Sequence, residues 1–175
     1  MGIQDILIKA RLEGIRNITP KSNFRWYFQV RCARCGEVND KEIYLVAEEF
    51  HEKWGTPGTF NFVMKCKICE NVGTINILNG SIKNYSVYGA VTASKNRDIE
   101  IEDYEGGSRE EFQPICQCET RGLVIVSYRL NDGFTVESLT NKIWEDVDLS
   151  QGDWCEYDED AGTVVGIYDI ETRVS

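Results

Sequence analysis

The sequence lacks the long apolar run that a membrane-spanning helix needs. No stretch within its 175 residues approaches the roughly 20 consecutive apolar side chains that cross a bilayer. Residues 1–6 include the acidic Asp5 and no apolar block, so they are unlike a secretory signal peptide. We therefore expect no membrane association and a cytoplasmic location, with the nucleus as the alternative.

Histidine is almost absent, since His51 is the single one. A Ser-His-Asp or Cys-His catalytic site would have to use it, and no pattern places a nucleophile beside it. Residues 158–160 are acidic but lack the spacing of an EF-hand calcium loop. We therefore expect no catalytic residues and no enzymatic activity, and we interpret His51 as an exposed or hydrogen-bonded side chain.

The cysteines do not form the even set that a disulfide framework requires. Their number is seven, which together with the missing secretory signal predicts a reducing compartment. Four of the seven form two Cys-x-x-Cys pairs, and 30 residues separate the pairs. In each pair one tight turn can present two sulfurs to the same ion, and two such turns complete a tetrahedron. The spacing predicts one zinc ion (Zn2+) per chain, with structural zinc knuckles formed by Cys32, Cys35, Cys66 and Cys69.

Helical periodicity is scarce, whereas alternation of apolar and polar residues is frequent. We expect strands at 6–12, 24–32, 43–46, 60–66, 74–78, 123–130, 143–144 and 163–170. Residues 17–20 suit a loop, and residues 47–58 suit a short helical turn or loop. The chain is thus predicted to be mainly β, with each cysteine pair at the end or turn of a hairpin. A redox dithiol would instead open a helix within a βαβ pattern, which is absent.

Basic residues are scarce only in the second half of the chain. Residues 1–96 hold 13 basic and 9 acidic side chains, whereas residues 97–175 hold 6 basic and 20 acidic side chains. The formal charge of the whole chain is −10. We predict a zinc-binding β subdomain at 1–83, an acidic loop or insertion at 84–111, and a metal-free β subdomain at 112–175. This division predicts a basic zinc end and an acidic opposite end.

Short phrases recur in the two halves. The phrase at 12–15 is similar to that at 120–123, and the phrase at 73–77 is similar to that at 162–167. The second match has an offset of 89 residues, which carries Cys66 onto Cys155. An internal duplication that kept its metal site in one half would explain the recurrence. Coincidence is the alternative, because short phrases of glycine and β-branched residues are common in β proteins.

The order of several phrases resembles one known family. They are Leu12–Ile18, Phe24–Tyr27, Cys32–Glu37, Lys65–Cys69, Ile75–Leu78, Arg121–Leu123, Asp153–Trp154, Tyr157–Glu159 and Val165–Tyr168. In this order they resemble the eukaryotic CXXC-motif-containing zinc-binding proteins, over nearly the whole chain. The resemblance implies two similar β subdomains joined into one extended barrel-like body, with one zinc held by the four cysteines. It implies no defined enzymatic reaction.

Three further cysteines lie outside the two pairs. Cys116 and Cys118 would face the same side of a strand, where they are either core thiols or a soft two-coordinate Cu(I) site. Cys155 has acidic neighbours that disfavour its thiolate. The family resemblance gives no role to Cys116 or Cys155.

Two functions remain open at the level of sequence. The first is a non-enzymatic, zinc-stabilised monomer that binds a protein partner or handles metal. The second is a zinc-stabilised thiol oxidoreductase similar to methionine sulfoxide reductase, with Cys118 as the nearest candidate nucleophile. Nucleic acid is the least expected partner, because aromatic and basic residues do not interleave around the cysteines.

Overall fold

The computed structural model describes residues 2–86 and 111–175, and within these residues it consists of strands and turns without a helix. No membrane-spanning helix is therefore found in this part of the chain. The first strands are β1 (Gly2–Glu13), β2 (Ile15–Pro20), β3 (Trp26–Cys32), β4 (Ile43–Leu45), β5 (His51–Lys53), β6 (Thr56–Phe60), β7 (Phe62–Lys65), β8 (Val72–Ile77) and β9 (Tyr85–Ser86). They are followed by β10 (Gln113–Arg121), β11 (Leu123–Arg129), β12 (Phe134–Ser138), β13 (Ile143–Val147), β14 (Trp154–Asp158) and β15 (Thr163–Val174).

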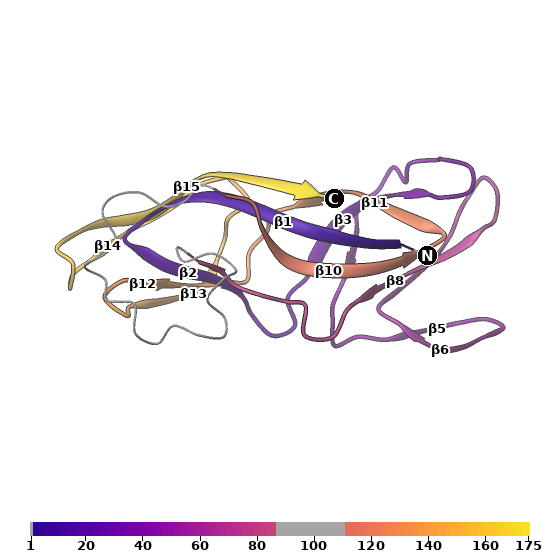
Figure 1. Cartoon of the computed structure of the whole chain (residues 1–175), viewed down its shortest axis with the longest axis horizontal. Helices are drawn as coiled ribbons and strands as arrows, with labels where there is room; N and C mark the ends of the chain where they lie inside the picture. The colour runs from indigo at the N-terminus through magenta and orange to yellow at the C-terminus, as the bar shows by residue number, and fades with distance from the viewer. Residues whose placement is uncertain (1, 87–110) are drawn as a thin grey trace.

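A six-stranded antiparallel sheet runs along the elongated body (Figure 1). Its order is β14-β15-β1-β10-β8-β7, so a hairpin lies at each edge and two long strands meet in the middle. Two smaller sheets have the orders β11-β3-β4 and β13-β12-β2-β9, and β5 and β6 form a separate hairpin. The mainly β fold predicted from the alternation is confirmed, and so is the extended body that the family resemblance implies.

The strands divide into two lobes that exchange segments. The cysteine lobe consists of β3, β4, β7, β8, β10 and β11, and the acidic lobe consists of β1, β2, β12, β13, β14 and β15. Each lobe therefore combines an early and a late part of the chain. The predicted boundaries at 83 and 112 do not coincide with these lobes, and the internal duplication stays a prediction. The predicted acidic loop lies mostly outside the described residues.

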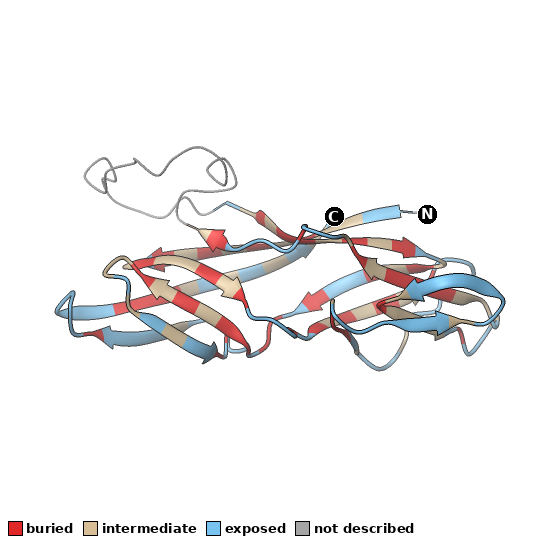
Figure 2. Cartoon of the chain, turned by 90° about the horizontal axis from the view of Figure 1, so that it is seen from below, coloured by how far each residue is buried: buried red, intermediate tan, exposed pale blue. Residues whose placement is uncertain are grey.

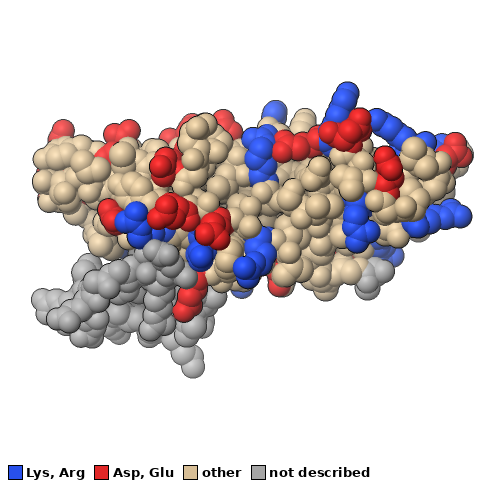
Figure 3. Space-filling model, turned by 90° about the horizontal axis from the view of Figure 1, so that it is seen from above, with Lys and Arg blue, Asp and Glu red and all other residues tan. Residues whose placement is uncertain are grey.

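This exchange changes the predicted charge division. Residues 26–77 and 113–129, which contain the cysteine lobe, carry eight basic and eight acidic side chains. Residues 2–20 and 134–174, which contain the acidic lobe, carry five basic and thirteen acidic side chains. Lys9, Arg11 and Arg16 belong to β1 and β2, so they lie with the acidic strands. On the face in Figure 3, Asp and Glu lie among the Lys and Arg side chains over the middle and right of the body. The cysteine lobe is thus neutral by count and not basic.

The core lies between the long sheet and the two smaller sheets (Figure 2). Alternate residues of β1 and β3 are buried, as period-two alternation requires. Trp26 packs against Phe24 and Tyr128, with ring centroids 4.7 and 5.7 Å away. The strands that hold the cysteines are therefore anchored in a continuous aromatic and aliphatic core.

Several segments differ from the sequence-based expectation, and one of them is β12, which was not expected as a strand. Residues 17–20 belong to β2, where Ile18 is buried and Pro20 takes the last position, which needs no further ladder hydrogen bond. Residues 47–58 include β5 and part of β6 and no helical turn. Residues 154–158 form the edge strand β14. Its backbone pairs with β15, and its acidic side chains do not interfere with this backbone pairing.

Candidate metal centre

The two Cys-x-x-Cys turns have the same backbone conformation. In the first, Cys32 ends β3, and its N–H donates to the Glu37 carbonyl while its carbonyl accepts from the Gly36 N–H. In the second, the Cys66 N–H donates to the Asn71 carbonyl, and the Cys66 carbonyl accepts from the Glu70 N–H. The residue after each pair adopts positive φ, 80° at Gly36 and 63° at Glu70.

The turns bring four sulfur atoms from two sheets together. The Sγ atoms of Cys32 and Cys69 are 3.6 Å apart, as are those of Cys35 and Cys66, and all four lie within 4.8 Å of one another. A tetrahedron of sulfurs about 2.3 Å from a central zinc has edges of about 3.8 Å. The arrangement therefore fits one tetrahedral ion. We call these residues the four-cysteine cluster.

Backbone N–H groups around the cluster favour thiolates. The N–H groups of Cys35 and Arg34 lower the pKa of Cys32 to about 6. Those of Cys69 and Ile68 lower the pKa of Cys66. At Cys35 the Glu37 N–H acts in the same direction, but partial burial and the neighbouring thiols raise its pKa to about 12. Four adjacent thiols cannot all ionise without a positive charge between them, and a soft divalent cation would supply it.

Two residues that the sequence did not single out hold the first turn. The Asn71 side chain donates to the Gly122 carbonyl at 3.3 Å and contacts the Cys32 sulfur at 3.9 Å. Gly122 has φ 70°, and its carbonyl also accepts from the Ala33 N–H at 3.1 Å. Both residues are distant in sequence from Cys32, so no local spacing could identify them. Such contacts orient metal ligands in known sites.

Basic side chains near the cluster are paired with acids. Lys67 lies 3.3 Å from Asp40, and Lys65 lies 3.9 Å from Glu70. All four side chains are more than half exposed, so these pairs contribute little stability. They also leave these two lysines less available to a nucleic-acid backbone.

The other cysteines and the histidine lie apart from the cluster. Cys116 and Cys118 share one face of β10, as predicted, with both thiols buried and their sulfurs 3.9 Å apart. The hydrogen bond with the neighbouring Cys116 thiol, together with burial, raises the pKa of Cys118. Cys155 is exposed on β14, and His51 is exposed on β5. The structure does not bring these residues together.

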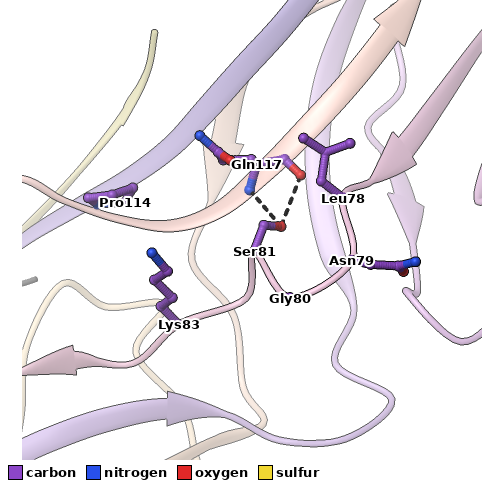
Figure 4. Close-up of a pocket in the computed structure, with 7 residues that line it drawn as sticks. All are labelled: Leu78, Asn79, Gly80, Ser81, Lys83, Pro114 and Gln117. Carbon is purple, nitrogen blue, oxygen red and sulfur yellow. Dashed lines mark hydrogen bonds between the residues drawn. The ribbon is translucent and has the colours of Figure 1, made fainter. Parts of the chain in front are cut away.

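A small cleft of about 230 Å³ opens between the segment after β8 and strand β10 (Figure 4). Ser81 stands at its floor, where its hydroxyl donates to the Gln117 carbonyl and accepts from the Gln117 N–H. Lys83 points its ammonium group toward the same cleft. No thiol lines it. The cleft therefore offers neither a nucleophile nor a metal ligand for thiol chemistry.

An all-β fold with one four-sulfur site defines a zinc-binding class of protein. The family model for the eukaryotic CXXC motif containing zinc binding protein matches residues 5–175, and the chain belongs to this family. The relative of that name from Homo sapiens is 34% identical over 172 residues, 97% of this chain and 96% of the relative.

Two solved structures share the fold. The crystal structure of C1orf123 has a TM-score of 0.82 and 32% identity, and the match covers 99% of each chain. A hypothetical protein from Plasmodium falciparum also has a TM-score of 0.82, with 25% identity and full coverage of both chains. The predicted family and its zinc cofactor are thus confirmed, and the four cysteines are clustered to hold one metal ion.

Proposed function

We propose that the four-cysteine cluster binds one zinc ion structurally and that the protein acts by binding a partner, without an enzymatic reaction. The observation that supports this most directly is that the four sulfur atoms come from two different sheets. Cys32 ends β3 in one of the small sheets, whereas Cys66 follows β7 at the edge of the six-stranded sheet. A bound ion would cross-link the two layers of the cysteine lobe. Four protein ligands also leave no open position for substrate, as is typical of structural sites.

The burial of the remaining thiols weighs against the alternative oxidoreductase. Cys118 has 0% exposed surface, so its sulfur does not reach a substrate in this conformation. Its raised pKa disfavours the thiolate that would attack. The exposed Cys155 lies beside the Tyr168 hydroxyl, and it does not line the described cleft in which a substrate could be held. A non-enzymatic role therefore fits the described residues better.

Substitution of one ligand tests the zinc site. Cys66→Ser is expected to remove zinc and to lower the free energy of unfolding by several kcal/mol, because structural zinc contributes on the order of 10 kcal/mol in small modules. The larger core here should soften that loss. Native mass spectrometry and urea unfolding measure both effects. The matched control is Cys155→Ser, which should keep one zinc ion per chain. A well-folded wild-type chain without stoichiometric zinc would refute the assignment.

The solvated face of the β11-β3-β4 sheet supports a protein partner. A row of stacked side chains crosses it: Arg129 lies 4.5 Å from the Tyr27 ring centroid, and the Tyr27 and Tyr44 centroids are 5.8 Å apart. Arg25 lies over the Tyr44 ring at 4.8 Å. Arginine and tyrosine are enriched at the energetically important positions of protein interfaces. We call this row the Arg–Tyr face.

Charge complementarity points to an acidic segment of a protein as the occupant. Arg25, Arg31 and Arg129 lie on or beside this face, and of the three Arg129 forms an ion pair, with Glu42. The whole chain carries a formal charge of −10, so a row of three arginines on one sheet face is a local exception. An acidic segment would gain both ion pairs with the arginines and contact with the tyrosine rings.

A comparative capture experiment tests this partner. Proteins retained by the immobilised zinc form should bind at least tenfold more weakly to Arg25→Glu, and equally well to the control Lys83→Glu. Cross-linking should map the contact to an acidic segment of the partner. Retention that is equal in both variants, or retention of RNA, would contradict the proposal.

Zinc exchange separates a structural role from metal handling. Cys35 is the most exposed ligand, through which a competing chelator would approach. A structural site should release zinc to a chelator no faster than the protein unfolds. Release that is much faster than unfolding would support metal handling instead. We expect the protein to be a monomer in the cytoplasm or nucleus, which ultracentrifugation and fractionation would test.

A further inference from the structure

The acidic lobe repeats the strand pairings that position the four-cysteine cluster. In the cysteine lobe, the β7–β8 hairpin pairs Phe62 with Ile75 and Lys65 with Val72. In the acidic lobe, the β14–β15 hairpin pairs Trp154 with Ile167 and Tyr157 with Val164. Every pair is shifted by 92 residues, not by the 89 that the sequence phrases predicted. Asp158, and not Cys155, therefore stands at the position of Cys66.

The turns after these positions also agree. The Glu70 N–H donates to the Cys66 carbonyl at 3.1 Å, and the Gly162 N–H donates to the Asp158 carbonyl at 2.9 Å. Glu70 and Gly162 have φ values of 63° and 68°. The two turns therefore place the side chains of Cys66 and Asp158 in equivalent positions.

The other half of the site has a counterpart as well. Cys32 pairs with Leu123, directly after Gly122, and Ser138 pairs with Ile15, directly after Gly14. The Gly122 carbonyl accepts from the Ala33 N–H, as the Gly14 carbonyl accepts from the Leu139 N–H. The two glycines have φ values of 70° and 69°. Ser138 thus stands at the position of Cys32.

The next turn is one residue shorter in the acidic lobe. The Gly36 N–H donates to the Cys32 carbonyl, and the Asn141 N–H donates to the Ser138 carbonyl. Gly36 and Asn141 have φ values of 80° and 66°. The residue before each closing position is Cys35 in one lobe and Thr140 in the other. Three of the four cysteine positions therefore hold Ser138, Thr140 and Asp158, and the position of Cys69 holds Ala161.

These three side chains are joined by hydrogen bonds. The Ser138 and Thr140 hydroxyl oxygens are 2.8 Å apart, and the Thr140 hydroxyl donates to the Asp158 carboxylate. The other carboxylate oxygen accepts the Asp160 N–H at 3.0 Å, and the Ser138 oxygen accepts the Lys142 N–H at 3.0 Å. Ser138 and Asp158 are both 0% exposed, so the bonds are shielded from water.

We infer that this hydroxyl–carboxylate cluster is the counterpart of the four-cysteine cluster, and that it cross-links the two layers of the acidic lobe without a metal. Ser138 ends β12 in the small sheet and Asp158 ends β14 at the edge of the long sheet, as Cys32 and Cys66 do on the other side. A chain of hydrogen bonds here occupies the place where thiolates converge in the cysteine lobe.

Single substitutions test the cross-link itself. Asp158→Ala should lower the melting temperature by about 10 °C, because it leaves the half-buried Thr140 hydroxyl and two N–H groups without their acceptor. Asp160→Ala, an exposed acid in the same turn, is the control and should have little effect. The difference should persist when zinc is removed with a chelator. Equal melting temperatures for the two variants would overturn the inference, whatever the state of the zinc site.

A loop exchange tests the positional equivalence. Residues 138–142 are replaced by the sequence of residues 32–37, and residues 158–162 by the sequence of residues 66–70. The folded chimera should bind two zinc ions per chain where the parent binds one. A folded chimera that binds a single ion would refute the equivalence. If the chimera does not fold, the double variant still decides whether the cross-link exists. Equal losses in Asp158→Ala and Thr140→Val with no further loss in the double variant support the cross-link, and additive losses contradict it.

Discussion

Single residues outside the cysteine pairs decide how the ligands are held. Gly122 has positive φ, and a Cβ atom there would lie 3.0 Å from the Asn71 side-chain nitrogen and 3.2 Å from the Gly73 Cα. The same carbonyl that fixes Ala33 also accepts from Asn71. The geometry of the Cys32 sulfur therefore depends on a residue 90 positions later in the chain.

Gly122→Ala should weaken both stability and zinc binding. We expect a loss of about 2 kcal/mol in the free energy of unfolding, since the substitution combines an unfavourable φ with two close contacts. Gly80→Ala is the control, because Gly80 has φ 73° but nothing within 4 Å of an added Cβ. Urea unfolding and competition with a zinc-binding dye measure the two effects. If both variants lose the same stability, the loss comes from the positive φ alone, and the predicted contribution of the close contacts at Gly122 is wrong.

Asp158 should make the stability depend on pH. The Thr140 hydroxyl bond lowers the pKa of Asp158 below that of the unfolded chain, about 3.9, despite burial. Its stabilisation is therefore complete above about pH 4 and is lost as the pH falls through the lower folded pKa. Asp158→Asn should remove this component, so unfolding curves of the two proteins should converge toward acid. Curves that stay parallel from pH 6 to pH 3 would contradict the argument.

At the level of elements, the strands that the sequence predicted most clearly are those with long alternation, whereas the short β12 alternates but was not expected. The segments of β1 and β3 were recognisable because alternate apolar residues enter the core. β2 was missed because its buried residues, Ile15, Ile18 and Pro20, do not follow a strict period of two. The β5–β6 hairpin was missed because most of its residues are exposed, so its pairing leaves no apolar pattern in the sequence. The ligand cysteines were recognisable from spacing alone, whereas Asn71 and Asp158 act only through distant partners.

The β5–β6 hairpin should tolerate substitution at its tip. Trp54 is 100% exposed there, so Trp54→Ser removes no buried contact and should change the free energy of unfolding by less than about 0.5 kcal/mol. Trp26→Ser, in the core with 0% exposure, is the contrast and should cost several kcal/mol. Thermal or urea unfolding compares them. A large loss for Trp54→Ser would mean that the hairpin is packed in solution.

On the scale of the whole molecule, the lobes are joined through the middle of the long sheet. β1 pairs with β15 of its own lobe on one side and with β10 of the cysteine lobe on the other. Ile6 and Cys116 form one of the pairs across this boundary, and both are buried. Neither lobe can therefore lose its central strand without exposing the core of the other.

Calorimetry should accordingly show one unfolding transition with zinc and one without it. Chelation should move the single transition to lower temperature and not create a second, because the lobes share their central strands. The ratio of calorimetric to van't Hoff enthalpy checks this. Two resolved transitions after chelation would show that the acidic lobe is stable on its own.

The exchange of β1 and β2 also sets an order of events during synthesis. These strands leave the ribosome first, but their partners β12 and β15 lie at residues 134–138 and 163–174, near the end of the chain. The cysteine pairs emerge by residue 69, yet β11, which flanks β3, begins only at residue 123. The four cysteines are therefore available to zinc before either lobe can complete its sheets. A zinc ion bound at that stage would hold the two Cys-x-x-Cys turns together while the later strands pair.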